Sequence, residues 1–269
     1  MEYCLLDSGN QKKFERFGKV TLVRPCAAAL WQPSLSKGEW AKADAEFSRE
    51  DDMGWSARLP NRWDVEHEGV TFKLSPTEFG HLGVFPEHSL LWSWAREKVE
   101  QRKGASVLNV FAYSGGATMA LAKGGANVCH VDASQGMVAW ARENAALNGL
   151  KDHPIRWIVD DAMKFLTREV RRGRKYDGIL FDPPSFGRGA KGEVFKIERD
   201  IGKLLQLGKQ LLSDDPLFYA CSTHTNGMSP IVMSHLLEEL MGEGVEAGEM
   251  ILEGDGRILP SGSYARWSQ

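Results

Sequence analysis

The hydrophobic pattern of the chain changes near residue 88. Beyond that point, short apolar runs alternate with longer amphipathic stretches, a pattern typical of buried parallel strands separated by helices. The predicted strands are Ser106–Phe111, Asn127–Asp132, Ile155–Val159, Tyr176–Asp182 and Leu217–Cys221. The predicted helices are Gly116–Lys123, Gln135–Asn148, Met163–Arg172, Lys196–Leu212 and Pro230–Met241.

The end of the chain adds two further strands, Glu246–Leu252 and Ser263–Trp267, on either side of a turn that contains Gly and Pro. This arrangement predicts a closing hairpin. Seven strands alternating with helices indicate the α/β class, with a Rossmann-like, mostly parallel, doubly wound sheet. We expect this domain over residues 76–269, with ligands at the carboxyl ends of its strands.

Residues 1–75 have a different texture, with frequent Gly and Pro and with β-like runs at Val20–Arg24 and Val70–Leu74. They predict a small, β-containing N-terminal extension. Four tryptophans lie in this part of the chain, at positions 31, 40, 55 and 63. We expect them to be packing anchors rather than platforms on which bases stack.

The composition is that of an ordinary globular protein, with 42% hydrophobic and 26% charged residues among 269. The four cysteines are widely spaced and form neither a CxxC pair nor a zinc-binding pattern. We therefore expect reduced thiols, a cytoplasmic protein and no metal. We also expect no membrane span, because no run approaches the ~20 apolar residues that a span requires. The net charge of −3 does not favour nucleic-acid binding, although it permits a local basic patch.

A glycine-containing loop follows the predicted strand Ser106–Phe111. It comprises Tyr113, Ser114, Gly115 and Gly116, and glycines allow a sharp turn and a close approach of backbone N–H groups to a ligand. The second strand ends in Asp132, near the spacing at which an acidic side chain accepts hydrogen bonds from ribose hydroxyls. The loop lacks the full GxGxxG of dinucleotide sites, so adenosine carrying a sulfonium fits it better than a pyrophosphate.

A second carboxylate site follows the third strand, in Asp160, Asp161 and Ala162. Each of these acidic residues has a structural alternative, since an Asp after a strand is often a helix cap. Asp132 would cap the helix that begins near Ser134, and Asp160 or Asp161 the helix that begins near Met163. The occurrence of all three at strand ends, in the right order, favours a cofactor site.

The fourth strand ends in Asp182, Pro183, Pro184, Ser185 and Phe186. Two prolines remove two backbone donors and stiffen the turn, which fixes the direction of the Asp side chain. Phe186 offers a ring on which a flipped base can stack. The alternative is a rigid turn with a buried Phe.

The fifth strand ends in the run from Tyr219 to His224, which contains Cys221, Ser222 and Thr223. A thiolate in this position has a specific use, because carbon-5 of cytosine becomes nucleophilic only after a thiolate adds to carbon-6. The alternative is that Cys221 is a small buried apolar residue, as free cysteines commonly are. From position and chemistry alone, both remain open.

Together these motifs resemble the bacterial 23S ribosomal RNA cytosine-C5 methyltransferases, which use S-adenosylmethionine and carry an Asp-Pro-Pro-aromatic motif. The resemblance covers about residues 80 to 269. It rests on residues 108–116 (LNVFAYSGG), 131–134 (VDAS), 160–161 (DD), 182–186 (DPPSF) and 220–222 (ACS), and on residues 83–88 (GVFPEH) as an upstream stretch. Two departures stand out: His88 occupies a position that is commonly Gln, and no RNA-binding domain of the PUA type is recognisable in residues 1–75.

The resemblance implies a role for each matching residue. Asp182 would hydrogen-bond the target base and Cys221 would be the nucleophile. The glycine loop and Asp132 would hold the methionine and ribose parts of the cofactor, and Asp161, with Asp160 as its rival, would accept from the adenine amino group. The implied cofactor-binding set is Phe85, His88, Asn109, Phe111, Tyr113, Ser114, Gly115, Gly116, Asp132, Ala133, Ser134, Asp160, Asp161, Ala162 and Asp182. The implied substrate-binding set is Pro183, Pro184, Phe186 and Arg188.

Basic residues fall into two groups. The cluster over residues 168–175 precedes a strand, so we expect it at the amino ends of the sheet, as a solvated face away from the cofactor. Arg188, Lys191, Lys196 and Arg199 follow the Asp-Pro-Pro turn and are better placed to contact phosphates.

Three functions therefore remain open at this stage. The first is cytosine-C5 methylation of large-subunit ribosomal RNA through Cys221. The second is methylation of a ring or exocyclic nitrogen without a covalent intermediate, because a nitrogen lone pair needs no thiol. The third is a non-catalytic nucleotide-binding Rossmann module, in which the residues at the strand ends are structural.

Overall fold

The computed structural model describes residues 2–49, 54–189, 192–254 and 257–269. The chain forms two compact units. Unit 1 comprises Met1–Glu87 and Ile251–Ser261, and unit 2 comprises His88–Met250 and Gly262–Gln269. The first boundary between the two units therefore lies after Glu87, beyond the predicted residue 75. The chain then returns to unit 1 at Ile251–Ser261. The local pattern of apolar residues contains no sign of this return.

Unit 1 is built on a five-stranded sheet, counted over the described residues, in the order β1-β2-β3-β4-β5. Its strands are β1 (Tyr3–Gly9), β2 (Lys12–Phe17), β3 (Val20–Pro25), β4 (Ala45–Ser48) and β5 (Gly54–Trp55). A one-turn helix, α1 (Lys37–Trp40), and a hairpin of β6 (Trp63–His67) and β7 (Val70–Leu74) complete it. The predicted β-containing extension is thus an ordered sheet, and the predicted run Val70–Leu74 coincides with β7.

The four tryptophans of unit 1 are packing anchors, as predicted. Each indole N–H donates to an acceptor within the unit. The pairs are Trp31 with the Ser8 carbonyl at 2.9 Å, Trp40 with Asp7 at 2.9 Å, Trp55 with the Thr77 carbonyl at 3.0 Å and Trp63 with the Phe17 carbonyl at 3.1 Å. An indole needs such a partner when it is removed from water.

A buried ion pair joins β2 to β3. Arg24 donates to both carboxylate oxygens of Glu15, from Nε at 2.8 Å and from Nη2 at 2.9 Å. Lys13 lies 3.1 Å from the same carboxylate. Burial alone would raise the pKa of Glu15, but the two cations outweigh burial and hold it below its usual value.

Unit 2 has the predicted Rossmann-like fold. Its described residues form a seven-stranded sheet in the order β10-β9-β8-β11-β14-β16-β15. The first five of these strands pair in parallel, and β16 pairs antiparallel with β14. The strands are β8 (Ser106–Val110), β9 (Asn127–Asp132), β10 (Ile155–Val159), β11 (Gly178–Phe181), β14 (Phe218–Thr223), β15 (Val245–Leu252) and β16 (Leu259–Ser268). A separate short pair, β12 (Phe186–Arg188) and β13 (Val194–Lys196), follows β11.

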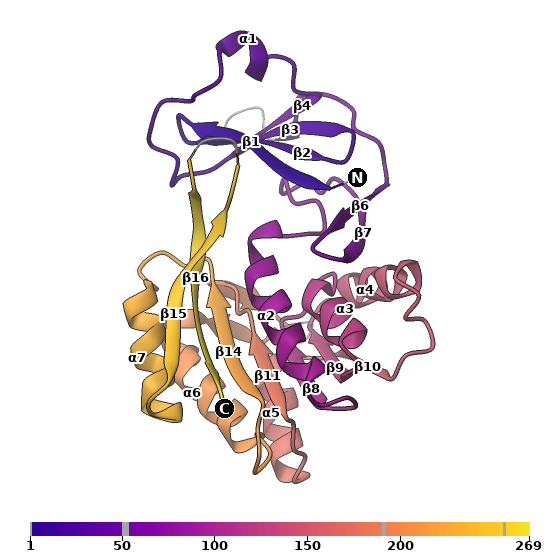
Figure 1. Cartoon of the computed structure of the whole chain (residues 1–269), viewed down its shortest axis with the longest axis vertical. Coiled ribbons are helices and arrows are strands. Elements are labelled where there is room, and N and C mark those ends of the chain that lie inside the picture. The colour runs from indigo at the N-terminus through magenta and orange to yellow at the C-terminus, as the bar shows by residue number, and fades with distance from the viewer. Residues whose placement is uncertain (1, 50–53, 190–191, 255–256) are drawn as a thin grey trace. The chain divides into compact units, whose positions relative to one another are not determined.

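Helices cover both faces of this sheet (Figure 1). On one face lie α2 (Ser89–Glu100), α3 (Gly116–Lys123) and α4 (Gln135–Leu147), and on the other lie α5 (Ala162–Arg171), α6 (Ile197–Gln210) and α7 (Pro230–Met241). The 3-10 turn η1 (Pro86–His88) leads into α2. The helix α2 was not predicted from the sequence, although its buried residues Leu91, Trp92, Ala95 and Val99 follow helical spacing.

Side chains alternate between the two helical layers along each central strand. In β8, Val107 packs under α2 and α3, whereas Leu108 and Val110 pack under α5 to α7. This period of two is what a strand with two buried faces requires. The carboxyl ends are level with one another, because Phe181 is in register with both Val110 and Cys221.

Candidate active site

The loop after β8 has an unusual backbone. Phe111 and Tyr113 both have positive φ, at 59° and 49°, and Gly115 has φ of 90°. Positive φ is rare for bulky residues and concentrates at binding sites. Gly115 is the N-cap of α3 and has no side chain with which to cap it, so first-turn N–H groups of this helix can bind a ligand.

Asp132 fastens this loop from the end of β9. Its carboxylate accepts hydrogen bonds from the backbone N–H of Tyr113 and of Ser134, both at 2.9 Å. Burial raises the pKa of Asp132, although these two hydrogen bonds oppose the rise. Ser134, and not Asp132, is the N-cap of α4. The alternative that Asp132 is the helix cap is therefore wrong. The remaining lone pairs of its carboxylate can accept hydrogen bonds from ribose hydroxyls.

Buried polar contacts support the loop from below. Asn109 on β8 donates to the hydroxyl of Thr118 on α3 at 2.9 Å, and that hydroxyl lies 2.9 Å from Nδ1 of His130 on β9. From α4, Asn144 donates to the Ser114 carbonyl at 2.9 Å. These buried contacts tie β8, β9, α3 and α4 together beneath the loop.

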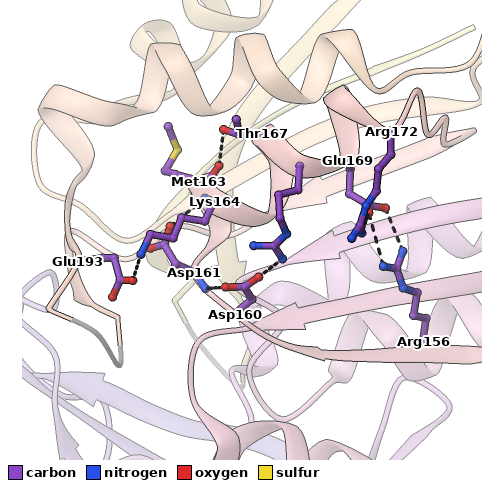
Figure 2. Close-up of polar contacts among 10 residues, drawn as sticks. Arg156, Asp160, Asp161, Met163, Lys164, Thr167, Glu169, Arg172 and Glu193 are labelled. Atoms are coloured by element: carbon purple, nitrogen blue, oxygen red, sulfur yellow. Dashed lines mark hydrogen bonds and ion pairs between the residues drawn. The ribbon is translucent and has the colours of Figure 1, made fainter.

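Asp160 and Asp161 follow β10 and differ in their contacts (Figure 2). Asp161 is the N-cap of α5 and accepts from the Lys164 N–H at 2.9 Å. The Asp160 carboxylate accepts from the Asp161 N–H at 2.9 Å and from the guanidinium of Arg168. Asp161 thus has the capping role that the sequence offered as an alternative, and Asp160 is held in an ion pair.

The prediction for Arg168 needs correction. We expected the cluster over residues 168–175 at the amino ends of the sheet, but Arg168 reaches Asp160 beyond the carboxyl end of β10. Helical side chains point toward the helix N-terminus, which carries the guanidinium back along α5. The next residue, Glu169, is buried and pairs with Arg156 and Arg172 at 2.9 and 3.0 Å (Figure 2).

Asp182 stands at the centre of a polar group after β11. Ser222 Oγ, at the end of β14, donates to Asp182 Oδ1 at 2.9 Å. Asp182 Oδ2 lies 3.5 Å from Nε2 of His88, and that nitrogen lies 2.9 Å from Nε2 of His224. From the sequence, Ser222 and His224 were assigned no role in the site. Their positions one and three residues after Cys221 were the available signal, because a parallel neighbour of β11 must end at the same edge.

Phe186 is an exposed ring on β12. It is 48% exposed, so the alternative of a buried Phe is wrong. The guanidinium carbon of Arg188 lies 5.7 Å from the centroid of its ring. The predicted loop is a short antiparallel pair, in which Phe186 is opposite Lys196. A planar group stacked on this ring would therefore lie close to two cations.

Cys221 lies in the core. Its side chain is fully buried in the cluster that β8, β9, β11 and β14 form with α5, α6 and α7. Burial, with a smaller contribution from the charge of Asp182, raises the pKa of the Cys221 thiol. The next residue, Ser222, points to the opposite face of the sheet, where it bonds Asp182. The thiol and the Asp182 carboxylate therefore extend toward different faces.

The remaining predicted site residues also lie at strand ends of unit 2, with one exception. Ala133 follows β9, Ala162 begins α5, Gly116 begins α3, and Pro183 and Pro184 follow Asp182. The exception is Phe85, which belongs to unit 1, where its ring packs edge-on against that of His81 with centroids 5.2 Å apart.

A sheet in the order found in unit 2, with polar side chains and a glycine-containing loop after its central strands, is typical of one class: enzymes that bind a nucleoside cofactor on a Rossmann-like fold. The particular family follows from the comparison with family models. Residues 15–246 match the model described as S-adenosylmethionine-dependent methyltransferase. The chain belongs to this family, and its cofactor is S-adenosylmethionine.

Solved structures agree with this assignment. The crystal structure of the SAM-dependent methyltransferase from Agrobacterium tumefaciens has a TM-score of 0.95 and 38% identity, and the match covers all of this chain and 90% of that one. A putative SAM-dependent methyltransferase from Streptococcus mutans has a TM-score of 0.76 and 18% identity over 98% of this chain and 74% of that one. The second match concerns the fold alone.

A curated relative is similar over part of the chain. The ribosomal RNA large subunit methyltransferase K/L of Shewanella baltica is 38% identical over 148 residues. The aligned region is 54% of this chain and only 20% of that protein. The chain thus matches about a fifth of the length of this relative.

The residues of the site fit the cofactor. The desolvated carboxylate of Asp132 offers acceptors to ribose hydroxyls, and the N-terminus of α3 offers donors to a carboxylate. Family and fold exclude a purely structural Rossmann module, so the protein is an S-adenosylmethionine-dependent methyltransferase enzyme. Among the residues that the structure describes, no helix is long and apolar enough to cross a membrane.

Proposed function

We propose that this enzyme methylates RNA, specifically large-subunit ribosomal RNA. The observation that carries the proposal is the exposed ring of Phe186, four residues after Asp182 on a turn stiffened by two prolines. An exposed ring beside a polar side chain suits a flipped base, which needs a stacking surface and a hydrogen-bond partner. The name of the relative from Shewanella baltica points to the same class of RNA.

A basic groove supports an RNA partner. Lys164, Arg168 and Arg171 of α5 and Lys203 of α6 line it, together with Met163 and Thr167, and no acidic residue is among these six. Lys164 and Arg168 already pair with Glu193 and Asp160, so Arg171 and Lys203 are the cations of this groove that we propose for phosphate contacts. Arg188 beside Phe186 adds a further cation.

For the cofactor, we propose the residues that the sequence indicated. The loop from Phe111 to Gly116 and Asp132 hold the methionine and ribose parts. Asp161 accepts from the adenine amino group. Its rival, Asp160, is less suited because Arg168 already neutralises its carboxylate. All of these residues lie within the predicted methyltransferase domain, residues 76–269.

We propose a nitrogen atom as the methyl acceptor. The lone pair of a nitrogen can attack the methyl carbon directly, without a thiol: the nitrogen–carbon bond would form as the sulfur–carbon bond of the cofactor breaks, and the proton released from the methylated nitrogen would pass to Asp182 or to water. Asp182, held through Oδ1 by Ser222, can accept an N–H of the base and aim the lone pair at the methyl carbon. The bound cofactor supplies the electrophilic methyl group.

The position of Cys221 supports this choice. A nucleophilic thiol must be reachable and partly ionised, whereas Cys221 is fully buried and its pKa is raised by burial. Cytosine-C5 methylation remains the second candidate. In its favour, Cys221 is in register with Phe181, the residue before Asp182, on the neighbouring strand.

The test is mass mapping of modified nucleosides in ribosomal RNA from cells with and without the gene. We expect one N-methylated nucleoside of the large subunit to disappear and to return with the wild-type gene. The Asp182→Ala gene should not restore it. Loss of 5-methylcytosine would favour the second candidate, and unchanged ribosomal RNA would overturn the RNA proposal.

A further inference from the structure

Three side chains of the kind that bind metals converge at the carboxyl edge of the sheet. They are His88, just before α2, Asp182, after β11, and His224, after β14. Nε2 of the two histidines and an oxygen of Asp182 all lie within 4.8 Å of one another. They come from three segments that are far apart in sequence, so the fold itself brings them together.

Their spacing suits a metal ion. Zinc binds histidine nitrogen and carboxylate oxygen at about 2.0–2.2 Å, which places tetrahedral ligands about 3.3 Å apart. Here the two nitrogens are 2.9 Å apart, and Nε2 of His88 is 3.5 Å from Asp182 Oδ2. These two distances bracket the expected value, and the third, between His224 and Asp182, lies within 4.8 Å, so binding of an ion requires the exposed His224 side chain to adjust.

A supporting contact orients the carboxylate. Ser222 Oγ donates to Asp182 Oδ1, which turns Oδ2 toward the histidines. Metal sites usually contain such outer partners, which fix their ligands. The side chains of His88 and Asp182 are 13% and 23% exposed, and His224 is exposed. The cluster is therefore accessible from solvent.

We propose that His88, Asp182 and His224 bind one divalent transition-metal ion, with Zn²⁺ as the best match. Two imidazoles and one carboxylate favour Zn²⁺ and Co²⁺ over Mg²⁺ and Ca²⁺, which prefer oxygen ligands. Three protein ligands leave a fourth position open. The ion would bind the Asp182 oxygen that does not accept from Ser222. If Asp182 also binds the target base, as the proposed function holds, the metal ion and the base would compete for this carboxylate.

The test is a Co²⁺ titration of the full chain, prepared without a histidine tag and freed of metal with a chelator. Co²⁺ in a tetrahedral site absorbs visible light. We expect a visible band that saturates at one equivalent of Co²⁺ and that one equivalent of Zn²⁺ abolishes. Neither RNA nor cofactor is present, so failure of this experiment would leave the proposed function untouched, and failure of the RNA mapping would leave the metal site untouched.

Substitutions of the proposed ligands test whether each of them binds the metal ion. Each of the variants His88→Gln and His224→Ala removes a proposed ligand and should weaken Co²⁺ binding at least about a hundredfold. This loss is larger than the one that usually follows removal of a residue that only orients a ligand. Ser222→Ala should weaken Co²⁺ binding about ten- to a hundredfold. The matched control is His235→Ala, because His235 is exposed on α7, and it should bind as the wild type does. Absence of a stoichiometric band in the wild type, or a band unchanged in both histidine variants, would overturn the proposal.

Discussion

At the scale of single residues, the two carboxylates nearest the proposed cofactor and base have different surroundings. Asp132 is held by two backbone N–H groups, whereas Asp182 is held by one hydroxyl and faces two histidines. Backbone donors belong to the fold and cannot move away, but a hydroxyl can rotate. Asp132 is thus suited to a fixed ligand and Asp182 to a group that changes during a reaction.

The first prediction concerns Asp132. Replacing it with Ala removes a charged acceptor, whose hydrogen bonds are typically worth about 1.5–3 kcal/mol, so affinity for S-adenosylmethionine should fall roughly ten- to a hundredfold. Calorimetric titration of the folded variant measures this. Asp152→Ala, in an exposed turn, is the matched control and should bind normally. Equal affinities in both variants would mean that Asp132 serves only the backbone.

The second prediction concerns Cys221. If nitrogen is the acceptor, Cys221→Ser should retain near-normal turnover, and RNA containing 5-fluorocytosine should form no covalent adduct with the wild type. Burial raises the pKa of this thiol and so disfavours the thiolate that attack on carbon-6 needs. Single-turnover methylation and denaturing electrophoresis provide the measurements. A serine variant slower by orders of magnitude, with a trapped adduct, would instead support carbon-5.

At the scale of elements, the short pair of β12 and β13 presents a ring to solvent. Phe186→Ala should remove about 1–3 kcal/mol of stacking from RNA binding and leave cofactor affinity unchanged. The melting temperature should stay close to that of the wild type, because the ring is half exposed. Val194→Ala, on the partner strand, is a control of similar exposure. A large drop in melting temperature with normal RNA affinity would assign Phe186 to packing.

The ion pair between β2 and β3 predicts a pH dependence. Because the pKa of Glu15 is lowered in the folded state, its charge stabilises unit 1 above the unfolded pKa, near 4.3. That contribution should be lost as pH falls through the lower, folded pKa. Urea unfolding at pH 7 and below pH 4 measures the loss in the wild type.

Variants of the same pair test its cause. Glu15→Gln leaves the buried guanidinium of Arg24 without a counter-charge, so it should cost about 3–5 kcal/mol at pH 7. Replacing both partners, with Glu15→Leu and Arg24→Met, should recover most of this and flatten the acid dependence. If Glu15→Gln unfolds with the wild-type midpoint at pH 7, the pair contributes nothing.

At the scale of the whole molecule, the distribution of charge matters more than its sum. The net charge is −3, yet α5 and α6 present Lys164, Arg168, Arg171 and Lys203 along one groove. Each phosphate contact that is lost should reduce the salt dependence of RNA binding, by about 0.7–0.9 in the slope of log K against log salt. Arg171→Ala with Lys203→Ala should therefore flatten the slope by about 1.4–1.8.

A control variant with the same change of charge distinguishes loss of contacts in the groove from a general effect of net charge on RNA binding. Lys98→Ala with Lys103→Ala removes two cations from α2 and the turn that follows it. If both double variants change the slope equally, the groove is not the contact surface.

The sequence predicted the fold of unit 2 well because its signals are local. Each strand is a short apolar run, and β9 and β10 begin and end where predicted. The carboxylates at the strand ends could be found because a parallel sheet places all its carboxyl ends at one edge. The helix α2 was missed because exposed Leu90 and polar residues obscure its apolar stripe.

Other features could not be predicted because they depend on distant contacts. The meeting of His88 with His224 spans 136 positions, and no local pattern links them. The side on which the Cys221 thiol lies was equally unpredictable, because its position near the end of a strand does not say which face of the sheet its side chain takes. That face followed only from the alternation along β14, where Ser222 bonds Asp182.

The return of residues 251–261 to unit 1 has a consequence for biosynthesis. Leu252 and Leu259 complete a small core with Leu5 and Ala29, near the start of the chain. A ribosome adds about 5–20 residues per second, so roughly 12–50 seconds separate the emergence of Leu5 from that of its partner Leu252. During that interval the nascent sheet of unit 1 lacks the side chains of Leu252 and Leu259 that complete this core. Completion of unit 1 therefore has to follow the synthesis of residues 88–250, which belong to unit 2.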